Sequence, residues 1–429
     1  MRRLLFIFSF LSLLVVDGKA QEVETLTLED CLRIGIDNNL SLEGKRKEIQ
    51  KSKYGVSENR SKLLPQITVI AGYNNNFDPP VSVTDGSSYG VPYNITKTLQ
   101  HTANAGLEMQ MPLFNQTLYT SMSIAKVMEE ISRLSYGKAR EDIIMQISKM
   151  YYLGQVTAEQ IVLIKANITR LEELRDITQA FFDNGMSMEV DLKRVNINLE
   201  NLKVQYDNAQ AMMKQQLNML KYIMDYPAEK EFVLTPVNTD SITTVALTGL
   251  SENIYELQLS QSQVQLAEKQ KKIISNGYIP SLSLTGSWRY AAYTDKGYHW
   301  FHSGPSNHWF RSYGLGLTLR IPIFDGLDKT YKIKKAMIDI ENSKLAWENA
   351  RKSLQTQYLN AVNDLMNNQR NFKKQKDNYL LAEDVYAVTS DRYREGIASM
   401  TEVLQDEMQM SEAQNNYISA HYNYRVTLS

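Results

Sequence analysis

Two acidic side chains occupy matching positions after two glycines, and they are the side chains of this sequence that best fit an electrostatic filter. Asp191 lies six residues after Gly185, and Glu402 lies six residues after Gly396. If each glycine ends one helix and another helix begins within a few residues, both carboxylates belong to the first turn of the second helix. There a carboxylate stabilises the helix N-terminus, and at a constriction it also attracts cations. Ser399 to Glu402 fits a capping box, so both roles stay open for Glu402.

Metal-binding side chains also occur in short clusters, although each cluster has a simpler explanation. His299, His302 and His308 share one segment with two tryptophans, which could hold a metal ion but is typical of an exposed aromatic loop. Paired methionines could bind Cu(I) through their thioethers, or they could fill helix and strand surfaces. These pairs are Met109 with Met111, Met186 with Met188, and Met408 with Met410. We therefore expect no resident metal or cofactor.

The sequence carries no catalytic pattern: it lacks a nucleophile elbow, a phosphate-binding loop and a run of metal ligands. We therefore expect no enzyme. Lys and Arg number 47 against 48 Asp and Glu, which leaves no basic excess to bind a nucleic acid. The single cysteine, Cys31, permits no internal disulfide, so the fold must depend on packing.

The N-terminus predicts export from the cytoplasm. Two arginines precede an apolar run from Leu4 to Val16, and Gly18-Lys19-Ala20 forms a small-x-small cleavage site. We therefore expect a signal peptide over residues 1–20. No later segment is long and apolar enough to predict a spanning helix.

The rest of the chain is an internal duplication, because two halves match in order at an offset of about 210 residues. The matching pairs include Leu64-Pro65 with Ile279-Pro280, Met111-Pro112 with Ile321-Pro322, and Tyr206 with Tyr417. We assign residues 21–226 to a first repeat, 227–250 to a linker and 251–429 to a second repeat.

Each repeat predicts a helix, two strands and a long helical hairpin. The strands alternate apolar and polar side chains, and we place them over residues 66–77, 103–114, 281–293 and 312–324. Gly, Pro, Asn and Ser predict loops within each pair of strands, over residues 78–101 and 294–311. The long stretches that follow contain no proline, which predicts helices reversed by turns near residues 185 and 396.

The helical stretches are unusually long and carry a coiled-coil pattern. From residue 115 to 183 a helix would extend about 100 Å at 1.5 Å per residue, far beyond a usual globular helix. On the helix after Gly185, largely apolar residues recur at alternating intervals of three and four, which predicts a coiled-coil packing stripe, here called the seam. Its residues are Leu192, Val195, Leu199, Leu202, Tyr206, Ala209 and Met213. Its counterpart in the second repeat is less apolar, with Asp406 interrupting the stripe.

Four strands with one apolar face predict a barrel that several copies of the chain share. Lipid does not tolerate an open sheet edge, so the strands must close on themselves. Outer-membrane barrels have at least about eight strands, so four strands per chain cannot close one alone. The sequence therefore predicts an oligomer.

These duplicated motifs resemble the TolC family of outer-membrane efflux proteins over nearly the whole mature chain. The resemblance rests on the opening Leu26-Thr27-Leu28-Glu29-Asp30, the proline-marked strand entries and exits, and the two turns in which an acid follows a glycine. It implies a mainly α fold with membrane β-structure. The expected assembly is a homotrimer, with a twelve-stranded barrel in the outer membrane of a Gram-negative bacterium and a tunnel of long antiparallel coiled-coil helices in the periplasm. A periplasmic adaptor and an inner-membrane pump are the expected partners.

The resemblance also implies roles for residues at the closed end of the tunnel. Asp191 and Glu402 would each form a ring in a trimer, although Gln405 stands where related channels often carry a second acid. Tyr393 would tie adjacent helices, with Asp191 as a possible acceptor and ordinary coiled-coil packing as the alternative. The turns that would dock the adaptor contain Gly185, Met186, Gly396 and Ile397.

Small molecules are the expected cargo of this passive conduit. Type I protein secretion and copper efflux are alternatives, because a channel that leaves recognition to its pump carries little cargo information. A periplasmic coiled-coil adaptor is the alternative of a different class. An adaptor would need one helical hairpin flanked by compact β domains, which the twofold repeat disfavours.

Overall fold

The computed structural model describes residues 24–85, 87–97, 99–236, 249, 251, 253–294 and 309–428. The chain divides into two compact units. Unit 1 comprises residues 1–40, 140–247 and 359–429, and unit 2 comprises residues 41–139 and 248–358. The expected signal peptide and the segment with His299, His302 and His308 lie outside the described residues. Among the helices that are described, none is both long and apolar enough to cross a membrane.

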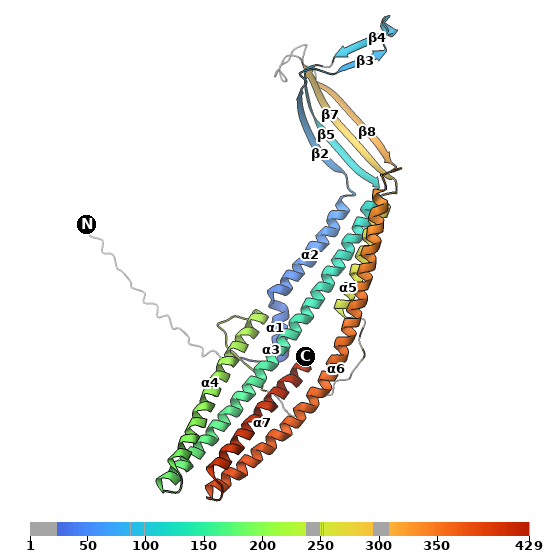
Figure 1. Cartoon of the computed structure of the whole chain (residues 1–429). Coiled ribbons are helices and arrows are strands. Elements are labelled where there is room, and N and C mark those ends of the chain that lie inside the picture. The colour runs from blue at the N-terminus through green and yellow to red at the C-terminus, as the bar shows by residue number, and fades with distance from the viewer. Residues whose placement is uncertain are drawn as a thin grey trace, which may run out of the picture. The chain divides into compact units, whose positions relative to one another are not determined.

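Unit 2 contains a four-stranded antiparallel sheet in the order β2-β5-β7-β8 (Figure 1). Each repeat contributes two neighbouring strands, and the two pairs join where Leu107 of β5 lies opposite Trp288 of β7. The outer strands β2 and β8 are edges within the described part of the chain. The strand bounds are β2 (Gln66–Asn75), β5 (His101–Phe114), β7 (Ser281–Thr294) and β8 (Trp309–Arg320).

Alternation along these strands produces one apolar and one polar face, because successive side chains point to opposite sides of a sheet. Leu315 and Leu317 on the apolar face are 80% and 68% exposed, which suits contact with lipid rather than with water. Trp288 and Tyr290 share this face, and their rings meet edge to face at 5.4 Å between centroids. Tyr293 follows Tyr290 by three residues and therefore falls on the polar face.

The segment from residue 78 to 101, predicted to be a loop, contains a second antiparallel hairpin. In this hairpin β3 (Val81–Asp85) pairs with β4 (Tyr93–Lys97) across the short helix η1 (Ser87–Tyr89). The loop prediction was wrong because each strand is too short for alternation to outweigh the prolines and glycines around it. The last strand also differs, since β8 ends at Arg320 rather than at residue 324.

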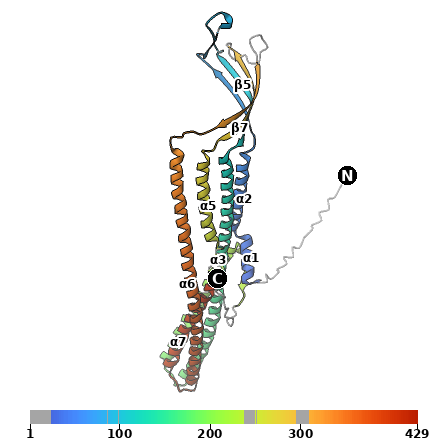
Figure 2. The same ribbon diagram turned by 90° about the vertical axis from the view of Figure 1, so that its right-hand side faces the viewer.

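Four helical segments accompany the sheet in unit 2 (Figure 2). The side chain of Lys138 in α3 lies 2.8 Å from the Glu256 carboxylate in α5, and Asn276 of α5 donates a hydrogen bond to Thr120 of α3. The segments are α2 (Leu40–Ser61), α5 (Tyr255–Asn276) and the first parts of α3 (Gln116–Asp183) and α6 (Asp328–Arg394).

Unit 1 is built around two helical hairpins, α3 with α4 (Glu189–Met224) and α6 with α7 (Met400–Thr427), as Figure 1 shows. With 68 residues in α3 and 67 in α6, the expected long helices are confirmed. All four helices contribute buried side chains to one apolar core, among them Leu171, Leu199, Tyr386 and Met410.

A second apolar cluster in unit 1 holds the start of the described chain. Thr27 and Asp30 form a capping box at the N-terminus of α1 (Leu28–Asn38), and Leu26 and Cys31 are buried beside it. Burial raises the pKa of the Cys31 thiol to about 12, so the thiol stays protonated and unreactive. The cluster also contains Phe232 and Leu234.

Two local features of this cluster differ from the sequence prediction. A strand, β6 (Phe232–Leu234), lies within the expected linker and pairs in parallel with β1 (Glu24–Leu26). The first helix is also divided in two: α1 ends at Asn38, and α2 begins at Leu40 after a break at Asn39. The Asn39 side-chain amide donates to the Ile223 carbonyl at 2.8 Å, which anchors the break to α4.

The coiled-coil seam is confirmed on α4, where Val195, Leu199, Leu202 and Ala209 are buried. On α7 the prediction needs correction, because the residue that enters the core is Glu407 and not Asp406. Steps of four and three from Val403 lead to residues 407, 410, 414, 417, 421 and 424, so polar side chains recur at 407, 414 and 421.

Candidate functional site

The two hairpins of unit 1 end in the same type of turn, which the repeated glycines make possible. Gly185 and Gly396 have φ angles of +71° and +75°, in the left-handed region that glycine enters without steric cost. The next residues, Met186 and Ile397, donate backbone hydrogen bonds to Phe181 and Arg392 at 2.7 and 2.8 Å, respectively. Each turn is therefore a Schellman motif. Met186 and Ile397 are 69% and 63% exposed, so each turn presents an apolar side chain to its surroundings.

Glu402 lies in the first turn of α7, as expected from its distance to Gly396. The hydroxyl of Ser399 accepts a hydrogen bond from the Glu402 backbone N–H at 3.3 Å, so Ser399 caps the helix. Within the described residues the Glu402 carboxylate itself takes no hydrogen bond or ion pair, so the reciprocal half of the capping box is not formed. The capping explanation therefore applies to Ser399, and the Glu402 carboxylate is exposed to solvent.

Asp191 occupies the matching place in the first turn of α4, but its environment differs. Its carboxylate lies 3.4 Å from the guanidinium of Arg194, and its side chain is only 18% exposed. A neighbouring cation partly cancels the field of a carboxylate. Glu402 is therefore the stronger source of negative charge of the two. The sequence contained Arg194 one helical turn after Asp191, and that spacing could have revealed the pair.

Tyr393 contacts a neighbouring helix of the same chain, and its tie to Asp191 in an assembled channel stays a prediction. The side chain is 5% exposed, and its hydroxyl donates to Thr178 of α3 at 3.4 Å. Its ring also packs against Phe181 at 5.5 Å between centroids. The hydroxyl and the ring of Tyr393 therefore both join α6 to α3. Within this chain Asp191 pairs with Arg194.

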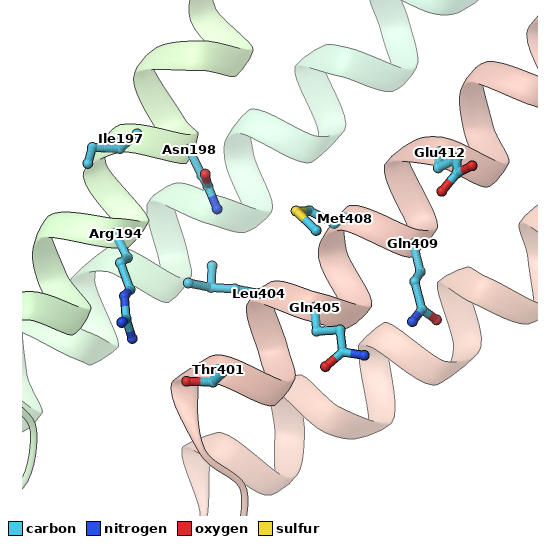
Figure 3. Close-up of a pocket in the computed structure, with 9 residues that line it drawn as sticks. All are labelled: Arg194, Ile197, Asn198, Thr401, Leu404, Gln405, Met408, Gln409 and Glu412. Carbon is cyan, nitrogen blue, oxygen red and sulfur yellow. The ribbon is translucent and has the colours of Figure 1, made fainter.

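A groove between α4 and α7 adjoins these turns (Figure 3). Arg194, Ile197 and Asn198 line it from α4, and residues from the first turns of α7 line the other side. Its volume is about 620 Å³. Gln405 lies in the groove rather than in the core, so an amide occupies the position of a second acid. The α7 residues are Thr401, Leu404, Gln405, Met408, Gln409 and Glu412.

A buried polar network runs through the core of unit 1, and the sequence interpretation missed it. Glu159 of α3 accepts hydrogen bonds from Tyr417 at 2.7 Å and from His421 Nδ1 at 2.8 Å. His421 Nε2 accepts from Arg425 at 3.2 Å, which places the ring proton on Nδ1. Burial alone would raise the pKa of Glu159, but the bonds from His421 and Tyr417 outweigh it and hold this pKa below its ordinary value.

The other polar side chains of the α7 seam have fewer hydrogen-bond and ion-pair partners. Gln414 accepts a hydrogen bond from Asn167 at 2.6 Å, while its own amide nitrogen is buried without a partner among the described residues. Glu407 is 6% exposed, and burial raises the pKa of its carboxyl, an effect that Arg170 only partly offsets. Arg170 itself pairs with Glu383 at 2.7 Å. The seam therefore holds a carboxyl that is costly to ionise.

Within the described part of the chain, the three methionine pairs lie apart and do not form one cluster. Met408 lines the groove and Met410 lies in the core, so this pair points in different directions. Met186 and Met188 are exposed at the turn of unit 1, whereas Met109 and Met111 belong to β5 of unit 2. Among the described residues, no group of three or more His, Cys, Asp or Glu side chains could hold a metal ion.

Comparison with known proteins agrees with the duplicated architecture. A family model described as outer membrane efflux protein matches residues 34–224 and again residues 239–428. The chain belongs to the outer membrane efflux protein family. The TolC outer membrane protein of Vibrio cholerae serotype O1 is 21% identical over 386 residues, which cover 87% of this chain and 82% of the relative.

Solved structures share the fold at low sequence identity. A structure of CusC gives a TM-score of 0.77 at 16% identity, covering 97% of this chain and 93% of that one. The open state of the Neisseria gonorrhoeae MtrE outer membrane channel gives 0.73 at 18% identity, covering 94% and 87%. These matches confirm the TolC-like fold, with its long coiled-coil helices, four antiparallel strands and two repeats.

Family membership settles the general role of the molecule. This outer membrane efflux protein is a non-enzymatic efflux channel in the outer membrane of a Gram-negative bacterium, with a helical portion in the periplasm. The family implies a trimeric channel that works within a tripartite pump.

Proposed function

We propose that this protein is the exit duct for small molecules in a tripartite pump, and that the turns of unit 1 both dock the adaptor and gate the flow. The observation that carries the proposal is the repeated Schellman turn, which places Met186 and Ile397 at equivalent exposed positions. Two matching apolar side chains on rigid turns suit a partner that binds both repeats in the same way. In a trimer they would offer six equivalent contacts.

The gate in this proposal depends mainly on Glu402. Its carboxylate has no partner in the described chain, so a trimer would place three uncompensated charges at one level of the passage. Such a ring favours cations. Asp191 contributes less because Arg194 partly cancels its field, and Tyr393 holds α6 against α3 beside the turn.

Docking is tested by placing a photo-crosslinking amino acid at Ile397 in cells that contain the whole pump. We expect a covalent product with the adaptor from this position. Leu345 of α6 is a matched control, because it is 59% exposed against 63% for Ile397 but belongs to unit 2. Adaptor capture at Leu345 and none at Ile397 would overturn the assignment of the docking surface.

Cargo is tested by deleting the gene and measuring sensitivity to toxic small molecules. We expect cells without the protein to accumulate dyes and antibiotics, and the wild-type gene to restore export. A strain that handles these compounds normally but becomes sensitive to copper, or that retains a secreted protein, would replace small-molecule export by one of those functions.

A further inference from the structure

The polar face of the unit 2 sheet carries an ion pair that connects the two repeats. Arg289 of β7 donates to the Glu108 carboxylate of β5 at 2.7 Å, and the two side chains are 40% and 48% exposed. Both residues lie on the opposite face of the sheet from Leu107 and Trp288, which belong to the apolar face. The pair therefore faces the passage in a barrel whose apolar face meets lipid.

The position opposite Arg289 explains how the pair forms. Gly106 is the direct partner of Arg289 in the strand register, and Glu108 is the next residue of β5 on the same face. A Cβ atom at position 106 would collide with the Trp288 carbonyl oxygen and the Arg289 backbone. Because Gly106 has no side chain, Arg289 can lean along β5 to reach Glu108.

The surroundings of the pair are uncharged and open. A hollow of about 580 Å³ lies on this face, and Glu108 is the only charged residue among those that line it. On the four described strands, the passage-facing side otherwise carries only one further Lys, Arg, Asp or Glu, the Arg320 at the end of β8. The hollow is lined by Gln66, Thr68, Glu108, Met109, Gln110, Thr285, Gly286, Ser287, Gly314, Leu315 and Gly316.

We propose that the Glu108–Arg289 pair sets the charge selectivity of the barrel, and that by pairing the two charges it keeps this level of the passage open to cargo of either sign. Either side chain alone would leave three like charges around the trimeric passage. A cross-strand ion pair also stabilises a sheet. The test must therefore report the local potential rather than stability.

A cysteine reporter in place of Ser287 measures that potential, because Ser287 lies directly opposite Glu108. The reporter is treated on intact cells with a cationic and an anionic methanethiosulfonate, and the ratio of the two rates is recorded. A change in the thiolate fraction of the reporter cysteine alters the rates of both reagents alike. The ratio of the two rates therefore reports the electrostatic potential at the reporter. Cys31 is fully buried, and protein without the reporter serves as the blank.

We expect opposite shifts from the two neutralising substitutions. Glu108→Gln leaves Arg289 unpaired and should favour the anionic reagent by about two- to fivefold, while Arg289→Gln should favour the cationic reagent by a similar factor. The exchanged pair, Glu108→Arg with Arg289→Glu, should bring the ratio back to the wild-type value.

Two controls make the result decisive. Arg320 is paired with Ser281, six residues from the reporter and roughly 20 Å along the strand, beyond a Debye length of about 8 Å. Arg320→Gln should therefore leave the ratio unchanged. Leu317→Cys on the lipid-facing side should react with neither reagent. An unchanged ratio in both single variants, with the trimer intact, would overturn the proposal, and so would a reactive Leu317→Cys variant beside an inert Ser287→Cys variant.

Discussion

Replacing Gly396 by valine perturbs one turn of unit 1 and leaves its core untouched. The φ angle of +75° is one that a β-branched residue adopts at a cost of about 1–2 kcal/mol. A Cβ atom added there meets no other atom within 4 Å, so the cost comes from backbone strain alone. Burial of a single large apolar side chain contributes about 1.5–3 kcal/mol, and many such side chains hold this unit together. We therefore expect the trimer to survive.

The expected defect of Gly396→Val is functional. A distorted turn moves Ile397, so export should fall to the level of the deletion strain and crosslinking from Ile397 to the adaptor should weaken. Heat-resistant trimer on gels and the amount of protein in the outer membrane should stay at wild-type levels. These readouts separate a docking defect from a folding defect.

Gly326→Val is a matched control for this experiment. Gly326 has a φ of +67° and equally open surroundings, but it lies in unit 2. The same strain at this position should leave export intact. Normal export by Gly396→Val would refute the assignment of the turn as the docking surface, and loss of export in both variants would show that backbone strain in general, rather than the turn, is responsible.

Three further predictions concern individual side chains. Glu402→Gln should reduce the cation preference of single channels in planar bilayers more than Asp191→Asn does, because Arg194 already partly cancels the charge of Asp191; equal effects would contradict this ranking. Glu407→Gln should raise the temperature at which the trimer dissociates at pH 8, because a buried carboxylate that Arg170 only partly offsets costs more than the about 1–3 kcal/mol of a neutral unsatisfied polar group. The pKa of Glu407 is raised in the folded state, so the penalty is absent below the ordinary value of 4.5, grows as the pH rises from there and is complete above the folded-state pKa. The gain from Glu407→Gln should therefore vanish below pH 4.5, and a pH-independent gain would refute the explanation. The exposed Glu412→Gln should show no gain at either pH. Thr27→Ala removes the capping box and should weaken α1 by about 1 kcal/mol, which hydrogen exchange of residues 28–38 would report as roughly fivefold faster exchange; unchanged exchange would mean that packing alone holds this helix end.

Periodicity alone predicted most of the architecture of this chain. Long proline-free stretches predicted α3 and α6, and alternation predicted the four strands of the sheet, because both patterns extend over many residues. The glycine turns were also predictable, since a residue at positive φ between two helices is usually glycine. These features are local, so a single sequence contains them.

The features that the sequence did not reveal depend on distant partners. Strand β6 exists because it pairs with β1 about two hundred residues earlier, and no local pattern marks a three-residue parallel strand. Tyr393 could not be matched with Thr178 from spacing, because the two residues are joined only by the packing of α6 on α3. Glu407 was missed for another reason: the interruption of the stripe was assigned to Asp406, one residue too early, although heptad steps from Val403 lead to Glu407.

The oligomeric mass of the purified protein in detergent, measured by native mass spectrometry, tests the central claim most directly. The edge strands β2 and β8 each lack a partner strand on one side in the described chain, and four strands are too few to close a barrel. We expect three copies of the chain in one particle. A stable monomer that keeps its β-structure would contradict the account, because its sheet would then persist with both edges unpaired.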